Sequence, residues 1–236
     1  MDKQLFKYQD GSTVLEASIA FPPNKHAPVI VVCHAWSGRD AVAQTAIEKI
    51  ASWGYVGFSL DVYGQGIFGK SRDECIALKA PFLKDRHMLN KRLMQGLKAA
   101  QEFGNVIAVI GFGFGGLCAL DLARSDPSLK GVGSIYGHFE EAEGLKNSSI
   151  QAKVLLLHGA DDPIVPVKEL YAFGDDLIQH KIPLEIHIFE NTLHAFMNPK
   201  VNDPANGVQY QPTSVEQTWH FVKLFLSDIF GSINTK

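Results

Sequence analysis

A glycine-rich turn at residues 111–116, which reads GFGFGG, limits the folds open to this chain of 236 residues. The apolar run at residues 106–110 predicts a buried strand before the turn, and residues 117–124 predict a helix after it. Glycine permits backbone angles that other residues adopt only with strain, so a glycine-rich turn suits a sharp change of chain direction. A tight passage from strand to helix is typical of two kinds of site, a dinucleotide-binding turn and a nucleophile elbow.

The first interpretation is a dinucleotide-binding turn, because Gly111, Gly113 and Gly116 match the pattern G-x-G-x-x-G. Such a site needs an acidic residue about 20 residues further on, at the end of the next strand, to bind a ribose. Residues 134–137 read SIYG and contain no carboxylate. The turn also follows several predicted strands, whereas this pattern belongs to the first strand–helix unit of its domain. A nucleotide-binding oxidoreductase is therefore the least favoured function for this chain.

The second interpretation is a nucleophile elbow, with the pattern G-x-Nu-x-G. Gly111 and Gly115 occupy the two flanking positions, which must be small to avoid collisions with the neighbouring backbone. The position of the nucleophile is then Gly113, which has no side chain. The start of the following helix supplies backbone N–H groups and a positive dipole end, and both stabilise an anion above the turn.

An elbow also predicts an acid and then a histidine, in that order, after later strands. Asp162 follows the apolar run 154–158, and His194 follows the apolar run 184–189. Taken alone, Asp162 before Pro163 could be only a turn former, and His194 is one of nine histidines in the chain. Together they favour a nucleophile–histidine–aspartate triad in which the nucleophile position holds Gly113.

Alternating strand and helix patterns predict the fold class. A hairpin is expected around Asp10-Gly11, and a loop rich in glycine is expected to lead into a long helix at residues 85–103. Further strands are expected at residues 28–33, 55–60, 106–110, 131–136, 154–158 and 184–189, and further helices at residues 41–53, 117–124, 167–180 and 212–229. This order predicts an α/β-hydrolase fold with a mostly parallel central sheet and helices on both faces. We expect a single domain covering residues 1–236.

The composition excludes several classes of protein. The net charge is −3 and no long basic block occurs, so a nucleic-acid partner is not expected. No apolar run has the length of a signal peptide core or of a membrane span, so no membrane association is expected. Three scattered cysteines fit neither a zinc site nor a disulfide framework, which favours the cytoplasm and no bound metal. We expect a monomer or a small homo-oligomer.

The chain resembles the dienelactone hydrolase family over nearly its whole length. The resemblance is carried by the segments VCHAWSGRD (32–40), GYVGF (54–58), DVYG (61–64), the glycine turn with LCALDLAR (117–124), the Asp162 loop and HAF (194–196). Family members hydrolyse small esters and lactones with a Cys-His-Asp triad and without a cofactor. The resemblance therefore implies a small-molecule ester or lactone substrate and no cofactor for this chain.

Three positions depart from the family pattern. Gly113 stands where the family has its nucleophilic cysteine, Ala35 where the best-known members have a glutamate, and Asn198 where they have an arginine that binds the substrate carboxylate. The first departure predicts that turnover is impaired, and the other two argue against dienelactone itself as the substrate. We do not expect Ser37, Cys33 or Cys118 to replace the nucleophile. A ligand-binding protein without catalytic activity is the alternative function on the same fold.

The resemblance also assigns roles to other residues. The amides of Phe114 and, by resemblance, Trp36 would form the oxyanion hole, although Trp36 could equally be only a pocket wall. Arg86 follows Asp85, a plausible helix cap, and could bind an anionic substrate or lie on the solvated surface. Tyr136 and His138 follow a strand at the same edge of the sheet and are candidates to line the substrate pocket.

Overall fold

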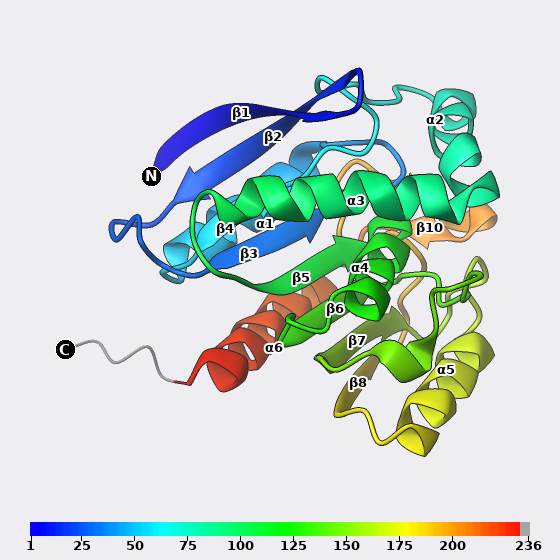
Figure 1. Cartoon of the computed structure of the whole chain (residues 1–236). Coiled ribbons are helices and arrows are strands. Elements are labelled where there is room, and N and C mark those ends of the chain that lie inside the picture. Colours follow the sequence, from blue (N-terminus) through cyan, green and yellow to red (C-terminus); the bar gives the residue numbers. More distant parts are fainter. Residues whose placement is uncertain (232–236) are drawn as a thin grey trace.

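The computed structural model describes residues 1–231, so the last five residues of the expected domain lie outside the described part (Figure 1). One eight-stranded sheet has the strand order β1-β2-β4-β3-β5-β6-β7-β8. Its strands are β1 (Asp2–Asp10), β2 (Thr13–Phe21), β3 (Val29–Cys33), β4 (Val56–Ser59), β5 (Val106–Phe112), β6 (Gly131–Ile135), β7 (Lys153–Gly159) and β8 (Leu184–Phe189). The helices are α1 (Ala41–Ser52), α2 (Arg72–Lys84), α3 (Arg86–Gln101), α4 (Phe114–Ser125), α5 (Val167–Gln179) and α6 (Pro212–Phe230).

The direction of the strands places the loops that matter for function. β1 pairs antiparallel with β2, and β2 pairs antiparallel with β4. All other neighbours in this sheet are parallel, from β4 across to β8. The carboxyl ends of β3, β5, β6, β7 and β8 therefore lie along one edge, where ligands bind in sheets of this kind.

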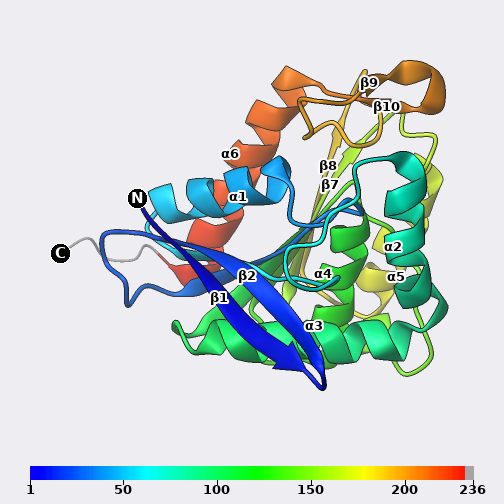
Figure 2. The ribbon, with the colours of Figure 1, turned by 90° about the horizontal axis from the view of Figure 1, so that it is seen from above.

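Helices cover both faces of the sheet (Figures 1 and 2). Helices α1 and α6 pack on one face, around Ile47, Phe112 and Phe225, which are buried. Helices α3, α4 and α5 cover the other face, around Leu93 and Leu120. The five residues of β3, VIVVC, are all buried because this strand contacts a helical layer on each face. The observed architecture confirms the predicted fold class.

One segment differs from the prediction. The glycine-rich segment after β4 was expected to be a loop up to residue 85, but residues 72–84 form helix α2. The Ser71 hydroxyl accepts a hydrogen bond from the Glu74 N–H at 3.2 Å, and Asp73 and Glu74 lie in the first turn. These residues cap the helix and complement its dipole, so a helix forms despite Pro81 near its end. A short hairpin, β9 (Asn202–Asp203) with β10 (Val208–Gln209), was also not predicted.

Candidate active site

The glycine turn joins β5 to α4, and Gly113 forms its apex. Gly113 has φ +54° and ψ −113°, in a region that residues with a side chain rarely adopt. Its N–H donates to the Ile135 carbonyl at 2.9 Å, and its own carbonyl accepts from Gly116 N–H at 2.9 Å. The hydrogen bonds hold this apex between the end of β6 and the first turn of α4.

The flanking glycines permit two close backbone approaches. A Cβ atom on Gly115 would collide with the carbonyl oxygens of Cys33 and His34, at the end of β3. A Cβ atom on Gly111 would collide with the Gly115 carbonyl across the turn itself. Small residues are therefore required at both positions, but only Gly115 is restricted by a neighbouring strand.

Position 113, in contrast, has room for a side chain. A Cβ atom built on Gly113 would lie 3.7 Å from Nε2 of His194 and 3.4 Å from the nearest ring carbon of Tyr136. Both distances are ordinary van der Waals separations. A short side chain at this position would therefore contact the imidazole of His194.

His194 is fixed by Asp162. Nδ1 of His194 lies 2.7 Å from Oδ2 of Asp162, whose other oxygen accepts from the N–H groups of Ile164 and Val165 at 2.8 and 2.9 Å. Burial alone would raise the pKa of Asp162, but the hydrogen bond and charge of His194 and the N–H group of Val165 lower this pKa below its usual value. An ionised Asp162 accepts the Nδ1 proton, which leaves Nε2 of His194 as an acceptor beside position 113.

The loop that carries His194 is held by backbone contacts. The His194 N–H donates to the Gly207 carbonyl at 3.0 Å, and the His194 carbonyl accepts from the Gln209 N–H at 3.2 Å. The next residue, Ala195, has φ +57°, which turns the chain sharply after the histidine. The β9–β10 hairpin thus positions His194, although no sequence pattern indicates this hairpin.

The two expected oxyanion residues are connected through Tyr63. The Tyr63 hydroxyl donates to the Trp36 carbonyl at 2.8 Å, and the Tyr63 ring stacks on Phe114 with centroids 6.3 Å apart. Within residues 1–231, the N–H groups of Trp36 and Phe114 form no hydrogen bond. Each of these amides can therefore donate to a ligand oxygen.

Tyr136 lies inside the site, and Arg86 is held in an ion pair. The Tyr136 ring is buried, and its centroid lies 5.1 Å from that of His194 in an edge-to-face contact. Nε of Arg86 donates to Oδ2 of the buried Asp121 at 2.9 Å, and one terminal nitrogen donates to Oδ1 at 2.7 Å. Arg124 also binds Asp121, at 2.9 Å. The guanidinium of Arg86 is thus already paired with a carboxylate.

Lys79 is a cation near the site that the sequence patterns do not predict. Its ammonium lies 5.1 Å from the centroid of the Trp36 ring and forms no ion pair with residues 1–231. Burial lowers the pKa of Lys79. Lys79 lies on α2, in the segment expected to be a loop, so no sequence pattern could place it beside Trp36. His138 also approaches the site, with its ring centroid 6.2 Å from that of His194.

The other candidate nucleophiles are either buried or hydrogen-bonded to a group other than a histidine. Cys33 and Cys118 are fully buried, and burial raises the pKa of both thiols. The third thiol, Cys75, is also buried with a raised pKa. The Ser37 hydroxyl donates to the Asp40 carboxylate at 2.7 Å, so no histidine activates it there. None of these groups has the environment of an activated nucleophile.

Neither a metal site nor a membrane span is visible in residues 1–231. No cluster of three or more histidine, cysteine, aspartate or glutamate residues in this range could hold a metal ion. In the same range, none of the helices combines the length and the apolar character needed to span a bilayer.

The glycine turn joins a strand to a helix, and a histidine bound to an aspartate lies beside it, after later strands. This arrangement is typical of the α/β hydrolases. The model of the dienelactone hydrolase family matches residues 15–230, so this chain belongs to that family. By family it is a hydrolase of carboxylic esters and lactones.

Individual relatives are distant. The chain is 22% identical to a putative carboxymethylenebutenolidase of Saccharolobus solfataricus, with 96% of this chain and 98% of the relative covered. It is 25% identical to a carboxymethylenebutenolidase homolog of Xenopus tropicalis, with 74% and 72% covered. The crystal structure of a dienelactone hydrolase-like promiscuous phosphotriesterase from metagenomic libraries superposes with a TM-score of 0.89 at 24% identity, covering 97% and 98% of the two chains. This structural likeness supports the fold.

Proposed function

We propose that this chain binds small esters or lactones at the elbow and hydrolyses them slowly, because it has the base, the acid and the oxyanion donors but not the nucleophile. The observation that carries the proposal is the position of Gly113. A nucleophilic side chain at residue 113 would contact Nε2 of His194, the nitrogen that would accept the proton of the nucleophile. Glycine has no side chain to act as the nucleophile. No acyl-enzyme can form at residue 113.

The remaining groups define the chemistry that is still possible. A substrate carbonyl oxygen would accept hydrogen bonds from the amides of Phe114 and Trp36, which would stabilise the oxyanion. Nε2 of His194 would accept a proton from a water molecule as the water oxygen attacks the carbonyl carbon. The same proton then passes to the leaving oxygen, so Asp162 stays ionised and holds the imidazolium. Removal of triad members in a serine protease leaves roughly 10³–10⁴-fold acceleration over water, and we expect activity of this order at most.

Tyr136 and a cation would contact the substrate. The Tyr136 ring contacts both position 113 and His194, so it would pack against the acyl group. The sequence leaves Arg86 either as an anion-binding residue or as a solvated surface residue, and in the structure Asp121 competes for that guanidinium. Lys79 has no such competitor within residues 1–231, so we expect it to contribute more than Arg86 to binding an acidic substrate.

The decisive test restores the nucleophile. Gly113→Cys places a thiol above a helix N-terminus and beside His194, and both effects lower a thiol pKa from its free value of about 8.5. We expect this variant to hydrolyse p-nitrophenyl acetate faster than the parent and to be labelled by iodoacetamide at residue 113. Adding His194→Ala should remove the gain. Gly113→Ala is the matched control, because it adds a Cβ atom without a thiol.

Two outcomes would contradict the proposal. If the parent already equals Gly113→Cys in rate, the nucleophile lies elsewhere in the chain. If Gly113→Cys folds but neither reacts with iodoacetamide nor turns over, Asp162 and His194 do not act as part of a triad.

The second candidate is a ligand-binding protein without catalytic activity, and the glycine at the nucleophile position is the observation that favours it. It predicts micromolar binding of a small ester by the parent, with no hydrolysis above the uncatalysed rate. For either function we propose a cytoplasmic location, because Cys33, Cys75 and Cys118 are free thiols, as is usual in a reducing compartment. We also propose that the protein is a monomer or a small homo-oligomer.

A further inference from the structure

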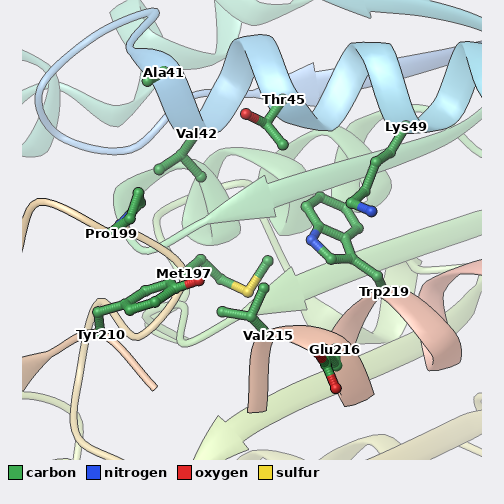
Figure 3. Close-up of a pocket in the computed structure, with 10 residues that line it drawn as sticks. All are labelled: Ala41, Val42, Thr45, Lys49, Met197, Pro199, Tyr210, Val215, Glu216 and Trp219. Atoms are coloured by element: carbon green, nitrogen blue, oxygen red, sulfur yellow. The ribbon is translucent and has the colours of Figure 1, made fainter. Parts of the chain in front are cut away.

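A cleft lies between α1, α6 and the loop that follows β8 (Figure 3). Its volume is about 450 Å³, within the range of small-molecule sites. Gly113, Asp162 and His194 are absent from its lining. The cleft lies on the α1–α6 side of the sheet, where Tyr136 of the candidate site belongs to the same core cluster as Met197 and Trp219. The cleft is therefore a neighbour of the candidate active site that shares none of its three proposed triad positions.

The walls of this cleft are mostly apolar, and several of them belong to the buried core. Val42 comes from α1, Met197 from the loop after β8, and Val215 and Trp219 from α6 (Figure 3). The Trp219 ring contacts the rings of Phe112 and of Trp53, each with centroids 6.1 Å apart. Trp219 is 7% exposed and Met197 5% exposed, so an aromatic ligand ring could contact the exposed edges of the indole and of the thioether.

A cation lies at the indole end of the cleft. The ammonium of Lys49 lies 5.7 Å from the centroid of the Trp219 ring. Within residues 1–231, Lys49 forms no ion pair and its ammonium donates no hydrogen bond. A positive charge beside an apolar pocket complements a ligand with an apolar body and one negative group.

A negative charge, on Glu216, lies on the other side of the cleft from Lys49 (Figure 3). Glu216 lines the cleft from α6, and its carboxylate lies on the α6 side, away from Lys49 on α1 (Figure 3). Glu216 would repel an anion weakly through solvent, while Lys49 can contact the anion directly. Removing the Glu216 charge should therefore strengthen anion binding, and removing the Lys49 charge should weaken it.

We propose that this cleft is a binding site for small aromatic carboxylates. The ring would lie against Val215 and the exposed edges of Trp219 and Met197, and the carboxylate would accept a hydrogen bond from Lys49. Binding in this cleft does not depend on the function proposed for the active site, so either proposal can fail alone.

Calorimetry with phenylacetate, and with the neutral phenylacetamide of the same shape, tests the proposal. We expect phenylacetate to bind the parent more tightly than the amide, and Lys49→Met to weaken it about tenfold while leaving the amide unaffected. Glu216→Gln should strengthen phenylacetate binding. Val215→Trp, which fills the cleft, should abolish binding of both compounds, and circular dichroism checks that each variant is folded.

The methyl resonances of the four methionines locate the ligand. Phenylacetate should shift the methyl resonance of Met197 and leave those of Met88 and Met94 unchanged. The substitution His194→Gln should not change the affinity of the protein for phenylacetate. The proposal is overturned if neither compound binds, if Lys49→Met has no effect, or if His194→Gln abolishes binding while Val215→Trp does not. The last result would place phenylacetate in the candidate active site.

Discussion

Nδ1 of His194 and Oδ2 of Asp162 lie 2.7 Å apart, and the carboxylate is held by two backbone N–H groups on its other side. This pair is therefore complete in a chain that has no side chain at the proposed nucleophile position, residue 113. Its geometry depends on the loops after β7 and β8 and on the β9–β10 hairpin that holds His194, and not on a side chain at residue 113. The acid–base pair and the nucleophile position can therefore be altered one at a time.

Asp162→Asn, introduced into Gly113→Cys, should greatly reduce the regained activity. An asparagine cannot accept the Nδ1 proton in the same way, so the wrong imidazole tautomer faces the thiol. The corresponding change in a serine protease lowers kcat about 10⁴-fold, and we expect a loss approaching this size. The measurement is kcat/KM for p-nitrophenyl acetate. Asp161→Asn is the matched control, because the Asp161 side chain is exposed and does not contact His194, and a similar loss there would contradict the assignment.

The same carboxylate should make folding stability depend on pH. The pKa of Asp162 is lower in the folded chain than the value of about 3.9 expected for an unfolded chain. The unfolded state thus binds more protons in this range, so the stabilisation is fully present above about pH 4 and is lost as the pH falls through the folded pKa. Urea unfolding at several pH values should show the parent and Asp162→Asn converging in stability as the pH falls below about 4. A difference between them that stays constant from about pH 7 to about pH 3 would contradict this linkage.

Gly115→Ala should destabilise the fold. Its Cβ atom would collide with backbone carbonyls at the end of β3, which cannot move as a side chain can, so we expect a loss of at least about 1–3 kcal/mol in the free energy of unfolding. Gly133→Ala is the control, because its Cβ would meet only Ile110 side-chain atoms, the nearest at 3.4 Å. Denaturant unfolding of both variants checks the difference, and equal stabilities would show that the elbow backbone adapts.

Lys79→Met should reduce binding of acidic esters and leave neutral esters unchanged. The ammonium near Trp36 has no acidic partner in the described residues, whereas Arg86 is bound to Asp121. We expect the Kd for the acidic ester to rise about threefold to tenfold. Calorimetry with monomethyl succinate, which keeps one carboxylate, and with the neutral dimethyl succinate measures this change. Lys79→Arg should preserve the preference for the acidic ester. A preference that survives Lys79→Met and is lost in Arg86→Ala would assign the role to Arg86.

NAD(H) and NADP(H) should not bind in the micromolar range, because β6 ends without the acidic residue that would hold a ribose. Fluorescence titration measures this directly. Tight binding of either dinucleotide would overturn the elbow interpretation.

Much of the fold could be predicted because strongly apolar runs, such as the one that forms β3, can be buried only in a central strand. The Asp162–His194 contact was anticipated from the order of the two residues along the chain, which the direction of the strands converts into proximity. Helix α2 was missed because its apolar pattern is weak and it contains Pro81. The pairing of Arg86 with Asp121 could not be anticipated either, since it joins residues 35 positions apart through tertiary packing.

Gly113 has a further consequence for how such a site could evolve. Its backbone angles, φ +54° and ψ −113°, cost of the order of 1–3 kcal/mol for a residue with a Cβ atom and little for glycine. Selection for stability alone would therefore retain glycine here, and only selection for turnover would favour a nucleophile. Under the proposed function, the trade-off between stability and activity is concentrated in this scaffold at a single codon.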